Sequence, residues 1–130
     1  MSMNDSLANA LSSILNDEKI GKGLCTIKPS SKIIKKVLDI MKNNQYIGDF
    51  EEMEDGRGNI IKVNLLGNIN KCGVVKPRYS VKKDQYEKYE ERYLLAKGMG
   101  ILMISTPLGI ISHDEAKKKN VGGKLLAYCY

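Results

Sequence analysis

Residues 101–130 read ILMISTPLGIISHDEAKKKNVGGKLLAYCY and decide the fold of the second half of the chain. The wholly apolar run Ile101–Ile104 predicts a buried strand. The polar stretch Ser105–Gly109 predicts a turn at the end of that strand, because Ser, Thr, Pro and Gly favour turns. Ile110 and Ile111 resume the strand pattern, so the stretch predicts a strand, a turn and a second strand.

A short helix is predicted directly after the second strand. Ser112 and Glu115 have the spacing of a capping box, in which a serine is followed three residues later by a glutamate. Lys117–Lys119 crowd the expected last turn, where the helix dipole favours cations. We expect Gly122–Gly123 to end this helix and Lys124–Tyr130 to form a closing strand.

The preceding part of the second half has a weaker pattern. Gly73–Val81 is predicted to be extended, and Pro77 indicates a sheet edge or a bend there. Lys82–Leu95 alternates charges with tyrosines, which fits either a short helix or a loop. Residues 67–71 are predicted to link the two halves of the chain.

The first half shows two amphipathic helices and a hairpin, whose turn is indicated by Asp55-Gly56. The chain is therefore predicted to be α+β with two small lobes, an N-terminal lobe and a C-terminal lobe that is mostly β with one or two short helices. The N-terminal lobe, residues 1–67, has the order α-β-α-β-β, and the C-terminal lobe is residues 68–130. The predicted N-terminal elements are a helix capped by Asn4 and Asp5, a strand at 24–27, a helix capped by Ser30 or Ser31, and strands at 46–53 and 60–66.

The positive charge is concentrated in the second half. The chain has a formal net charge of +6; residues 1–67 carry nine basic and nine acidic side chains, and residues 68–130 carry twelve basic and six acidic ones. Such an excess favours RNA, because contacts with phosphates release counterions, although a solvated basic surface is an equal alternative. Lys32, Lys35 and Lys36 share one face of the second helix, which is either solvated or turned to phosphates.

Metal, cofactor and membrane sites are not indicated. The three cysteines are scattered without a C-x-x-C pair and His113 is the single histidine, so we expect reduced, partly buried thiols and no zinc. No secretory signal and no apolar run of about 18 residues occur, which predicts a soluble, cytoplasmic protein. The acids at 49–55 lack the order of a calcium loop and predict a solvated hairpin, away from any phosphate.

Catalysis is not indicated either. A hydrolase would have to use Ser105 with His113, but no G-x-S-x-G elbow surrounds Ser105. A catalytic triad needs a base that a carboxylate orients, whereas His113 is expected at a solvated helix start. We therefore expect no enzyme, and keep the hydrolase as an alternative of another class. It would be favoured by a Ser105→Ala variant that was inactive but still bound RNA.

The residues around Ser105 fit RNA binding. The hydroxyls of Ser105 and Thr106 can bond to phosphate, ribose and base edges. Gly109, Gly122 and Gly123 would allow a close approach of the backbone, because glycine has no Cβ. From these residues alone, an ordinary strand-turn-strand with glycine turns is the preferred interpretation.

The run Gly98–Tyr130 closely resembles the signature of the small-subunit ribosomal protein eight family, the universal S-eight family. The resemblance extends to Asn4–Leu11, Lys28–Lys32 and Asn70–Gly73, and so covers nearly the whole chain. His113–Ala116, the acidic hairpin and the Tyr128-Cys129-Tyr130 ending resemble the archaeal and eukaryotic branch.

The resemblance implies a structural constituent of the small ribosomal subunit in the cytoplasm, with no cofactor. It would bind a helix in the central domain of small-subunit rRNA, mainly through the C-terminal lobe, and would help to assemble the subunit. Its other partners would be further small-subunit ribosomal proteins and possibly its own messenger RNA, without a membrane, and it would be a monomer when outside the ribosome. The implied RNA-binding residues are Asn4, Asp5, Ser31, Lys32, Ser105, Thr106, Gly109, Gly122, Gly123 and Lys124.

One departure from the family pattern affects this site. Many bacterial members continue the Ser-Thr pair with a second serine and then a lysine, where this chain has Pro107 and Leu108. The third hydroxyl is absent, and proline removes an amide donor. A stiffer turn could instead hold Ser105 and Thr106 in position.

Overall fold

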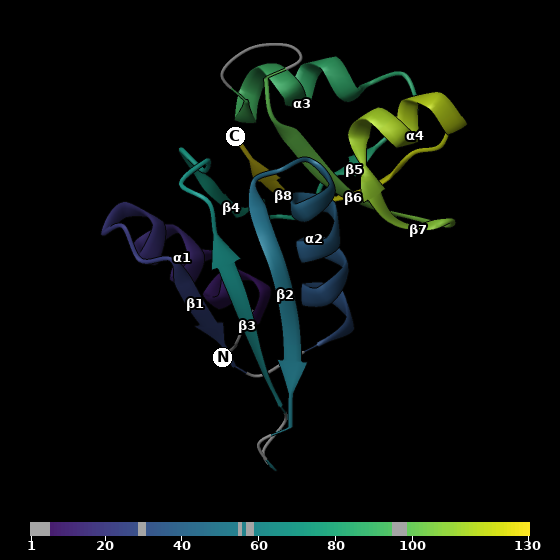
Figure 1. Ribbon diagram of the computed structural model, residues 1–130. Coiled ribbons are helices and arrows are strands. Elements are labelled where there is room, and N and C mark those ends of the chain that lie inside the picture. The colour runs from purple at the N-terminus through teal and green to yellow at the C-terminus, as the bar shows by residue number, and fades with distance from the viewer. Residues whose placement is uncertain (1–5, 29–30, 55, 57–58, 95–98) are drawn as a thin grey trace. The chain divides into compact units, whose positions relative to one another are not determined.

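The computed structural model describes residues 6–28, 31–54, 56, 59–94 and 99–130. The chain divides into two compact units that meet between Asn70 and Lys71, close to the expected link. Each unit combines helices with an antiparallel sheet, so the predicted α+β class is confirmed (Figure 1). We call residues 1–70 the N-terminal unit and residues 71–130 the C-terminal unit.

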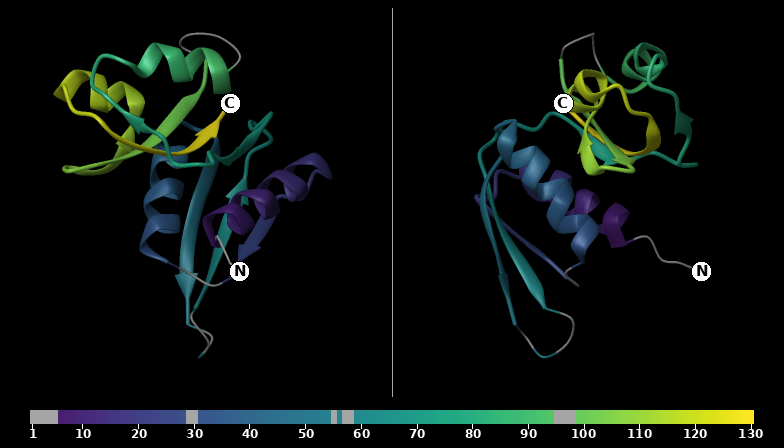
Figure 2. Two further views of the ribbon diagram at one scale, coloured as in Figure 1. Left: turned by 180° about the vertical axis from the view of Figure 1, so that it is seen from behind. Right: turned by 90° about the vertical axis from the view of Figure 1, so that its right-hand side faces the viewer.

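The N-terminal unit has the predicted α-β-α-β-β order. Its three strands pair antiparallel in the order β1-β3-β2, and both helices lie on one face of this sheet (Figure 2). The elements are α1 (Ser6–Lys19), β1 (Leu24–Ile27), α2 (Lys32–Asn43), β2 (Ile47–Met53) and β3 (Ile60–Leu65).

The apolar stripes predicted from the sequence form the core of this unit. Burial of each large aliphatic side chain contributes about 1.5–3 kcal/mol, which is what holds two short helices against a three-stranded sheet. The buried helix residues are Leu7, Ala10, Leu11 and Ile14 in α1, and Ile34, Val37, Leu38 and Met41 in α2.

Helix α2 also forms ion pairs with the acidic hairpin. Lys35 Nζ lies 3.1 Å from Glu52 Oε1, and Lys42 Nζ lies 3.0 Å from Asp49 Oδ1. Both pairs are exposed to solvent, so each contributes little to stability. Lys35 is therefore paired within the protein, which its position on a predicted solvated or phosphate-facing surface did not indicate.

The C-terminal unit is built around β8 (Gly123–Cys129), which pairs antiparallel with three other strands. The main path of the sheet is β4-β8-β6-β7, and β5 also pairs with β8. The remaining elements are β4 (Cys72–Val74), β5 (Ser80–Val81), α3 (Tyr86–Tyr93), β6 (Ile101–Thr106), β7 (Gly109–Ser112) and α4 (His113–Lys119).

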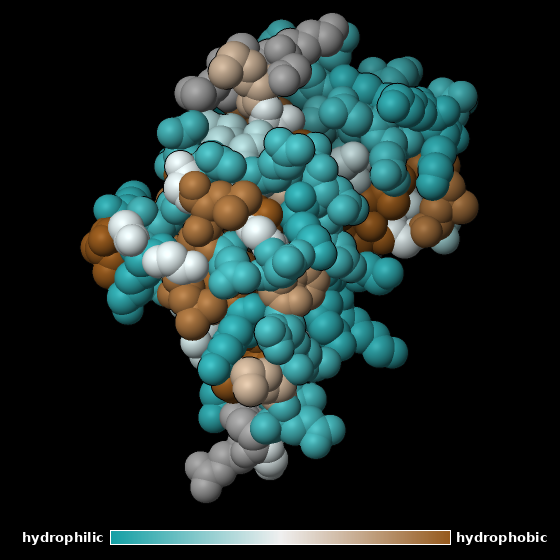
Figure 3. Space-filling model, in the orientation of Figure 1, coloured by the Kyte–Doolittle hydropathy of each residue, from teal (hydrophilic) through white to brown (hydrophobic). Residues whose placement is uncertain are grey.

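Helices α3 and α4 share a hydrophobic cluster with the sheet of this unit. Leu102, Ile104 and Leu125 from the sheet pack with Tyr86 from α3 and Ala116 from α4. The Tyr86 hydroxyl donates a 2.7 Å hydrogen bond to the carbonyl oxygen of Val121, which fixes α3 to the segment after α4. Hydrophilic side chains cover the outer side of α3 and α4 (Figure 3).

Two local expectations need correction or completion. Lys82–Leu95, for which a helix and a loop were both open, contains the two-turn helix α3. Helix α4 ends at Asn120, which adopts a left-handed conformation (φ 55°), and not at Gly122–Gly123. Asparagine tolerates that conformation better than most residues, so it can replace glycine at a helix end.

All three cysteines are buried thiols, as expected, and none forms a disulfide. In the part of the chain that is described, no helix has the length and apolar character needed to cross a bilayer.

Candidate nucleic-acid interface

The end of β6 carries the two hydroxyl residues singled out from the sequence. Ser105 and Thr106 belong to strand β6 and pair with Ile110 and Gly109 of β7, so the prediction that they lie in the turn is wrong. The turn itself consists of Pro107 and Leu108. The strand extends beyond its apolar run because the cross-strand bonds continue to the tight turn.

Thr106 organises this turn from within. Its Oγ1 donates a 2.7 Å hydrogen bond to the carbonyl oxygen of Gly109 and accepts one of 3.1 Å from the amide of Leu108. A threonine hydroxyl has one donor and two acceptor positions, so only one acceptor position is left for a ligand. The stiff turn considered above is thus held by Thr106 itself.

Ser105 belongs to an exposed row of three residues across the sheet, with Lys124 at its centre. It pairs with Lys124 of β8, and Lys124 pairs in turn with Ser80 of β5. Directly paired residues of neighbouring strands project from the same face, with Cβ atoms about 4.5–5.5 Å apart. All three side chains are exposed. Within the described residues, the Ser105 hydroxyl has no protein partner, so its donor is available to a ligand.

The two late glycines have a structural reason beside this row. A Cβ on Gly123 would overlap the carbonyl oxygen of Ser105, and one on Gly122 would overlap that of Val81. These glycines therefore let β8 and the segment before it approach β6 and β5 closely. Gly109 differs, because its φ of 114° requires glycine while the space around it is open.

The predicted contacts of the first half belong to the N-terminal unit. Ser31 is the N-cap of α2, as predicted, and its hydroxyl accepts a 3.2 Å hydrogen bond from the amide of Ile34. Lys32 follows as the first residue of the helix and is exposed. Asn4 and Asp5, assigned both a capping and an RNA-binding role, lie outside the described residues.

His113 is buried, so its expected position at a solvated helix start is wrong. Its side chain is 2% exposed, and Nδ1 accepts a 3.0 Å hydrogen bond from the amide of Leu102. Nε2 lies 3.5 Å from a carboxylate oxygen of Glu90, and Lys117 Nζ also contacts that oxygen. Burial lowers the pKa of His113, although the carboxylates of Asp114 and Glu90 oppose this. The imidazole thus ties β6, α3 and α4 together.

The lysines at the end of α4 consequently fall into two kinds. Lys117 is partly buried against Glu90, whereas Lys118 and Lys119 are exposed. Ser112 caps α4 as predicted, with its hydroxyl accepting a 3.4 Å hydrogen bond from the amide of Glu115. No group of three or more His, Cys, Asp or Glu side chains suited to a metal ion occurs among the described residues.

A family model described as Ribosomal protein S8 matches residues 5–130. This chain belongs to the ribosomal protein S8 family. The match spans nearly the whole chain and both compact units, so the resemblance first noted in the sequence is confirmed. The S8 family consists of structural ribosomal proteins that bind rRNA in the small subunit, in company with other ribosomal proteins.

In this S8 protein, the fold brings some of the predicted RNA-binding residues together and leaves others in the other unit. Ser105, Thr106, Gly109, Gly123 and Lys124 lie together at one end of the C-terminal sheet, whereas Ser31 and Lys32 belong to the other unit. Sequence reasoning missed Ser80. Its place in an extended segment was predicted, but only the pairing of β5 with β8 brings it beside Lys124.

Proposed function

We propose that this S8 protein binds a helix in the central domain of small-subunit rRNA through its C-terminal unit and so helps to assemble the subunit. The observation that carries the proposal is the exposed row of Ser80, Lys124 and Ser105. It offers two hydroxyls and a cation at the edge of a rigid sheet. Residues 68–130 carry twelve basic and six acidic side chains, and this excess of six positive charges supplies the attraction for phosphates.

Each part of this surface has its own task. Lys124 neutralises a phosphate, which adds affinity but carries no sequence information. Ser105 can donate to a base edge or ribose, and short side chains on closely packed strands let the RNA come near. Thr106 and Gly109 hold the turn that borders the row. Recognition of an irregular helix then depends on shape as much as on charge.

Three further properties are part of the proposal. The chain is of the archaeal and eukaryotic type, supported by His113–Ala116 and the ending Tyr128-Cys129-Tyr130. It acts in the cytoplasm, and it is a monomer outside the ribosome. A messenger RNA with a similar irregular helix would compete with the rRNA for the same row.

The first test compares the purified protein with its Ser105→Ala variant in binding an isolated central-domain rRNA helix across a salt series. We expect Ser105→Ala to weaken binding by about 1–3 kcal/mol at every salt concentration, because a hydrogen bond is lost and no charge changes. Lys124→Gln should instead flatten the dependence of affinity on salt. Thr26→Ala, at an exposed position of β1, is the matched control.

The outcome separates specific recognition from charge attraction. Specific binding survives an excess of unrelated duplex RNA. If Ser105→Ala bound as tightly as Thr26→Ala, the assigned row would be wrong. If the wild-type protein bound every RNA equally and salt abolished that binding, only its basic charge would be at work.

A further inference from the structure

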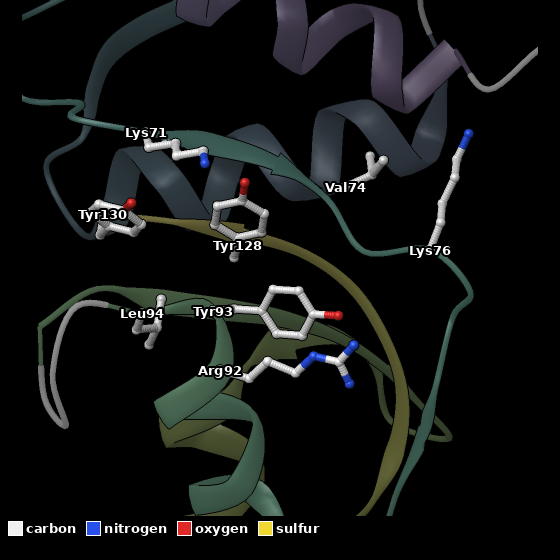
Figure 4. A pocket seen from close by; sticks show the side chains of 8 residues that line it. All are labelled: Lys71, Val74, Lys76, Arg92, Tyr93, Leu94, Tyr128 and Tyr130. Carbon is white, nitrogen blue, oxygen red and sulfur yellow. The ribbon is translucent and has the colours of Figure 1, made fainter.

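A second surface of the C-terminal unit is a hollow of about 550 Å³ that the RNA-binding row does not use. It is lined by parts of β4, β8 and the end of α3, together with the segments that follow β4 and β8. Three tyrosines and three cations dominate the lining (Figure 4): Tyr93, Tyr128, Tyr130, Lys71, Lys76 and Arg92.

The tyrosine rings form a continuous stack. Tyr128 lies between the other two, with ring centroids 5.7 Å from Tyr93 and 6.3 Å from Tyr130. The interplanar angles are 28° and 23°, so each ring is stacked on its neighbour with a moderate tilt. Tyr128 and Tyr130 project from the same face because they are two residues apart on an extended chain. All three rings are only half-buried, which leaves aromatic surface open to the hollow.

Two residues border the tyrosine stack, a glycine at Gly73 and an arginine at Arg92. Gly73 pairs with Tyr128, and a Cβ on Gly73 would come within 3.1 Å of the Tyr128 hydroxyl. The guanidinium of Arg92 lies 5.2 Å from the ring centroid of Tyr79 and 5.4 Å from that of Tyr93. These cation–π contacts hold the guanidinium beside the two rings, where Arg92 lines the hollow.

The charged side chains that line the hollow are all cations. Lys71, Lys76 and Arg92 are exposed, and no side-chain carboxylate among the described residues lines the hollow. Burial raises the pKa of Tyr93, an effect that Arg92 partly opposes. The Tyr93 hydroxyl therefore keeps its proton at neutral pH and can donate a hydrogen bond.

The hollow and the RNA-binding row lie at opposite ends of the β6–β8 pair. Ser105 pairs with Lys124 at one end, and Ile101 pairs with Cys129, next to Tyr130, at the other. Four residues separate Ile101 from Ser105, which is about 14 Å along a strand. A ligand in the hollow would thus be a separate contact from one on the row.

We propose that this hollow binds an unpaired RNA nucleotide, with its base against the tyrosine stack and the neighbouring phosphates at Lys71 and Arg92. Flat rings beside several cations suit a single-stranded nucleotide, because its base faces are accessible and its backbone is anionic. A duplex hides its base faces in the stack, and an acidic peptide uses the cations but not the rings. The inference rests on the proposed rRNA binding and adds a second contact of a different kind.

The test uses the full chain and a fluorescent hexaadenylate, with its abasic counterpart as the ring-free probe. We expect Tyr130→Leu and Tyr128→Leu to weaken hexaadenylate binding about tenfold, since stacking on one aromatic side chain contributes about 1–3 kcal/mol per base. Tyr93→Phe keeps the aromatic ring, so its affinity for hexaadenylate should fall by less. The control Tyr46→Leu removes a half-buried tyrosine from the N-terminal unit and should bind like the wild type.

Far-ultraviolet circular dichroism checks the fold of each variant. If Tyr128→Leu does not fold, Tyr130→Leu and Arg92→Gln, both at the rim of the hollow, still test the proposal. Binding of the central-domain helix is measured in parallel. The tyrosine variants should change that affinity much less than Ser105→Ala does, and Ser105→Ala should leave hexaadenylate binding unchanged.

Two results would overturn the inference. One is hexaadenylate affinity in Tyr130→Leu equal to that in Tyr46→Leu. The other is equal affinity of the wild type for the abasic oligonucleotide together with displacement by hexaglutamate, which would mark a surface for acidic peptides. Either result leaves the central-domain binding to be judged by Ser105→Ala alone, so the two proposals fail separately.

Discussion

The two ends of the β6–β8 pair are both exposed and basic, yet they are built in opposite ways. At the Ser105 end two short serines flank Lys124, and glycines let the neighbouring backbones come close together. At the Tyr130 end, large rings from α3 and from the end of β8 line a hollow. The comparison teaches that one sheet can present hydroxyls for close contact at one end and aromatic faces at the other.

The largest expected effect is a difference in the stability that each end loses when one of its glycines is replaced by alanine. Gly123→Ala should lower the free energy of unfolding by about 3 kcal/mol, because its Cβ would meet the Ser105 carbonyl and neither backbone can move freely. Gly73→Ala should cost about 0.5 kcal/mol, since the tip of the Tyr128 side chain can shift by a few tenths of an ångström.

Urea unfolding of both variants measures this difference, with Gly23→Ala as the control. Gly23 has open space around it and no positive φ. Equal losses for Gly123→Ala and Gly73→Ala would contradict the distinction between a close-packed end and an adaptable one.

A smaller effect concerns the turn at the Ser105 end. Thr106→Val keeps the branched shape but removes both hydrogen bonds of the hydroxyl, so we expect a loss of about 1 kcal/mol in unfolding free energy. Thr106→Ser keeps the hydroxyl and should therefore retain most of the wild-type stability. Thr26→Val, on an exposed strand position, should be near neutral. A Thr106→Val protein as stable as Thr26→Val would show that the turn does not need the hydroxyl.

The smallest expected effect is the loss of stability when His113 is protonated. It should reach both ends of the β6–β8 pair, because His113 links α3, which carries Tyr93, to β6 and α4. Burial lowers the pKa of His113 below its ordinary value of 6.5, so the folded state prefers the neutral imidazole. Its contribution to stability is fully present above pH 6.5 and is lost as the pH falls, when the unfolded chain takes up the proton more readily.

Urea unfolding between pH 7.5 and pH 5 measures this loss. His113→Gln, which cannot titrate, should show a flatter pH dependence than the wild type. If both proteins lost stability in parallel, other groups would cause the pH dependence, and Asp114, Glu90 and Lys117 around the ring would be examined next.

Most of the fold was predictable from local patterns, and the failures share one physical cause. The hairpin of the first half, the Ser31 cap of α2 and the Ser112 cap of α4 depend on neighbouring residues, and all were confirmed. The burial of His113 depends on Glu90 of α3 and on Leu102 of β6, which are distant in sequence.

The candidate sites follow the same rule. Ser105 and Thr106 were found from local chemistry and a family resemblance, and their contact with RNA stays a prediction. Ser80 and the tyrosine hollow could not be found, because Tyr93 and Tyr128 meet only when α3 packs beside β8. Alternating tyrosines along Lys82–Leu95 were the one signal, and that segment was left open between a short helix and a loop.

The central place of β8 also sets the order in which this protein can become functional during its synthesis. Strands β4 and β5 find their pairing partner only in β8, which is made after every other strand of the unit. A growing chain can therefore complete residues 1–70 early, while the sheet that carries both basic ends waits for residues 123–129. A chain that stops before residue 123 thus lacks the assembled sheet of the C-terminal unit, and with it the row of Ser80, Lys124 and Ser105 that we propose binds rRNA.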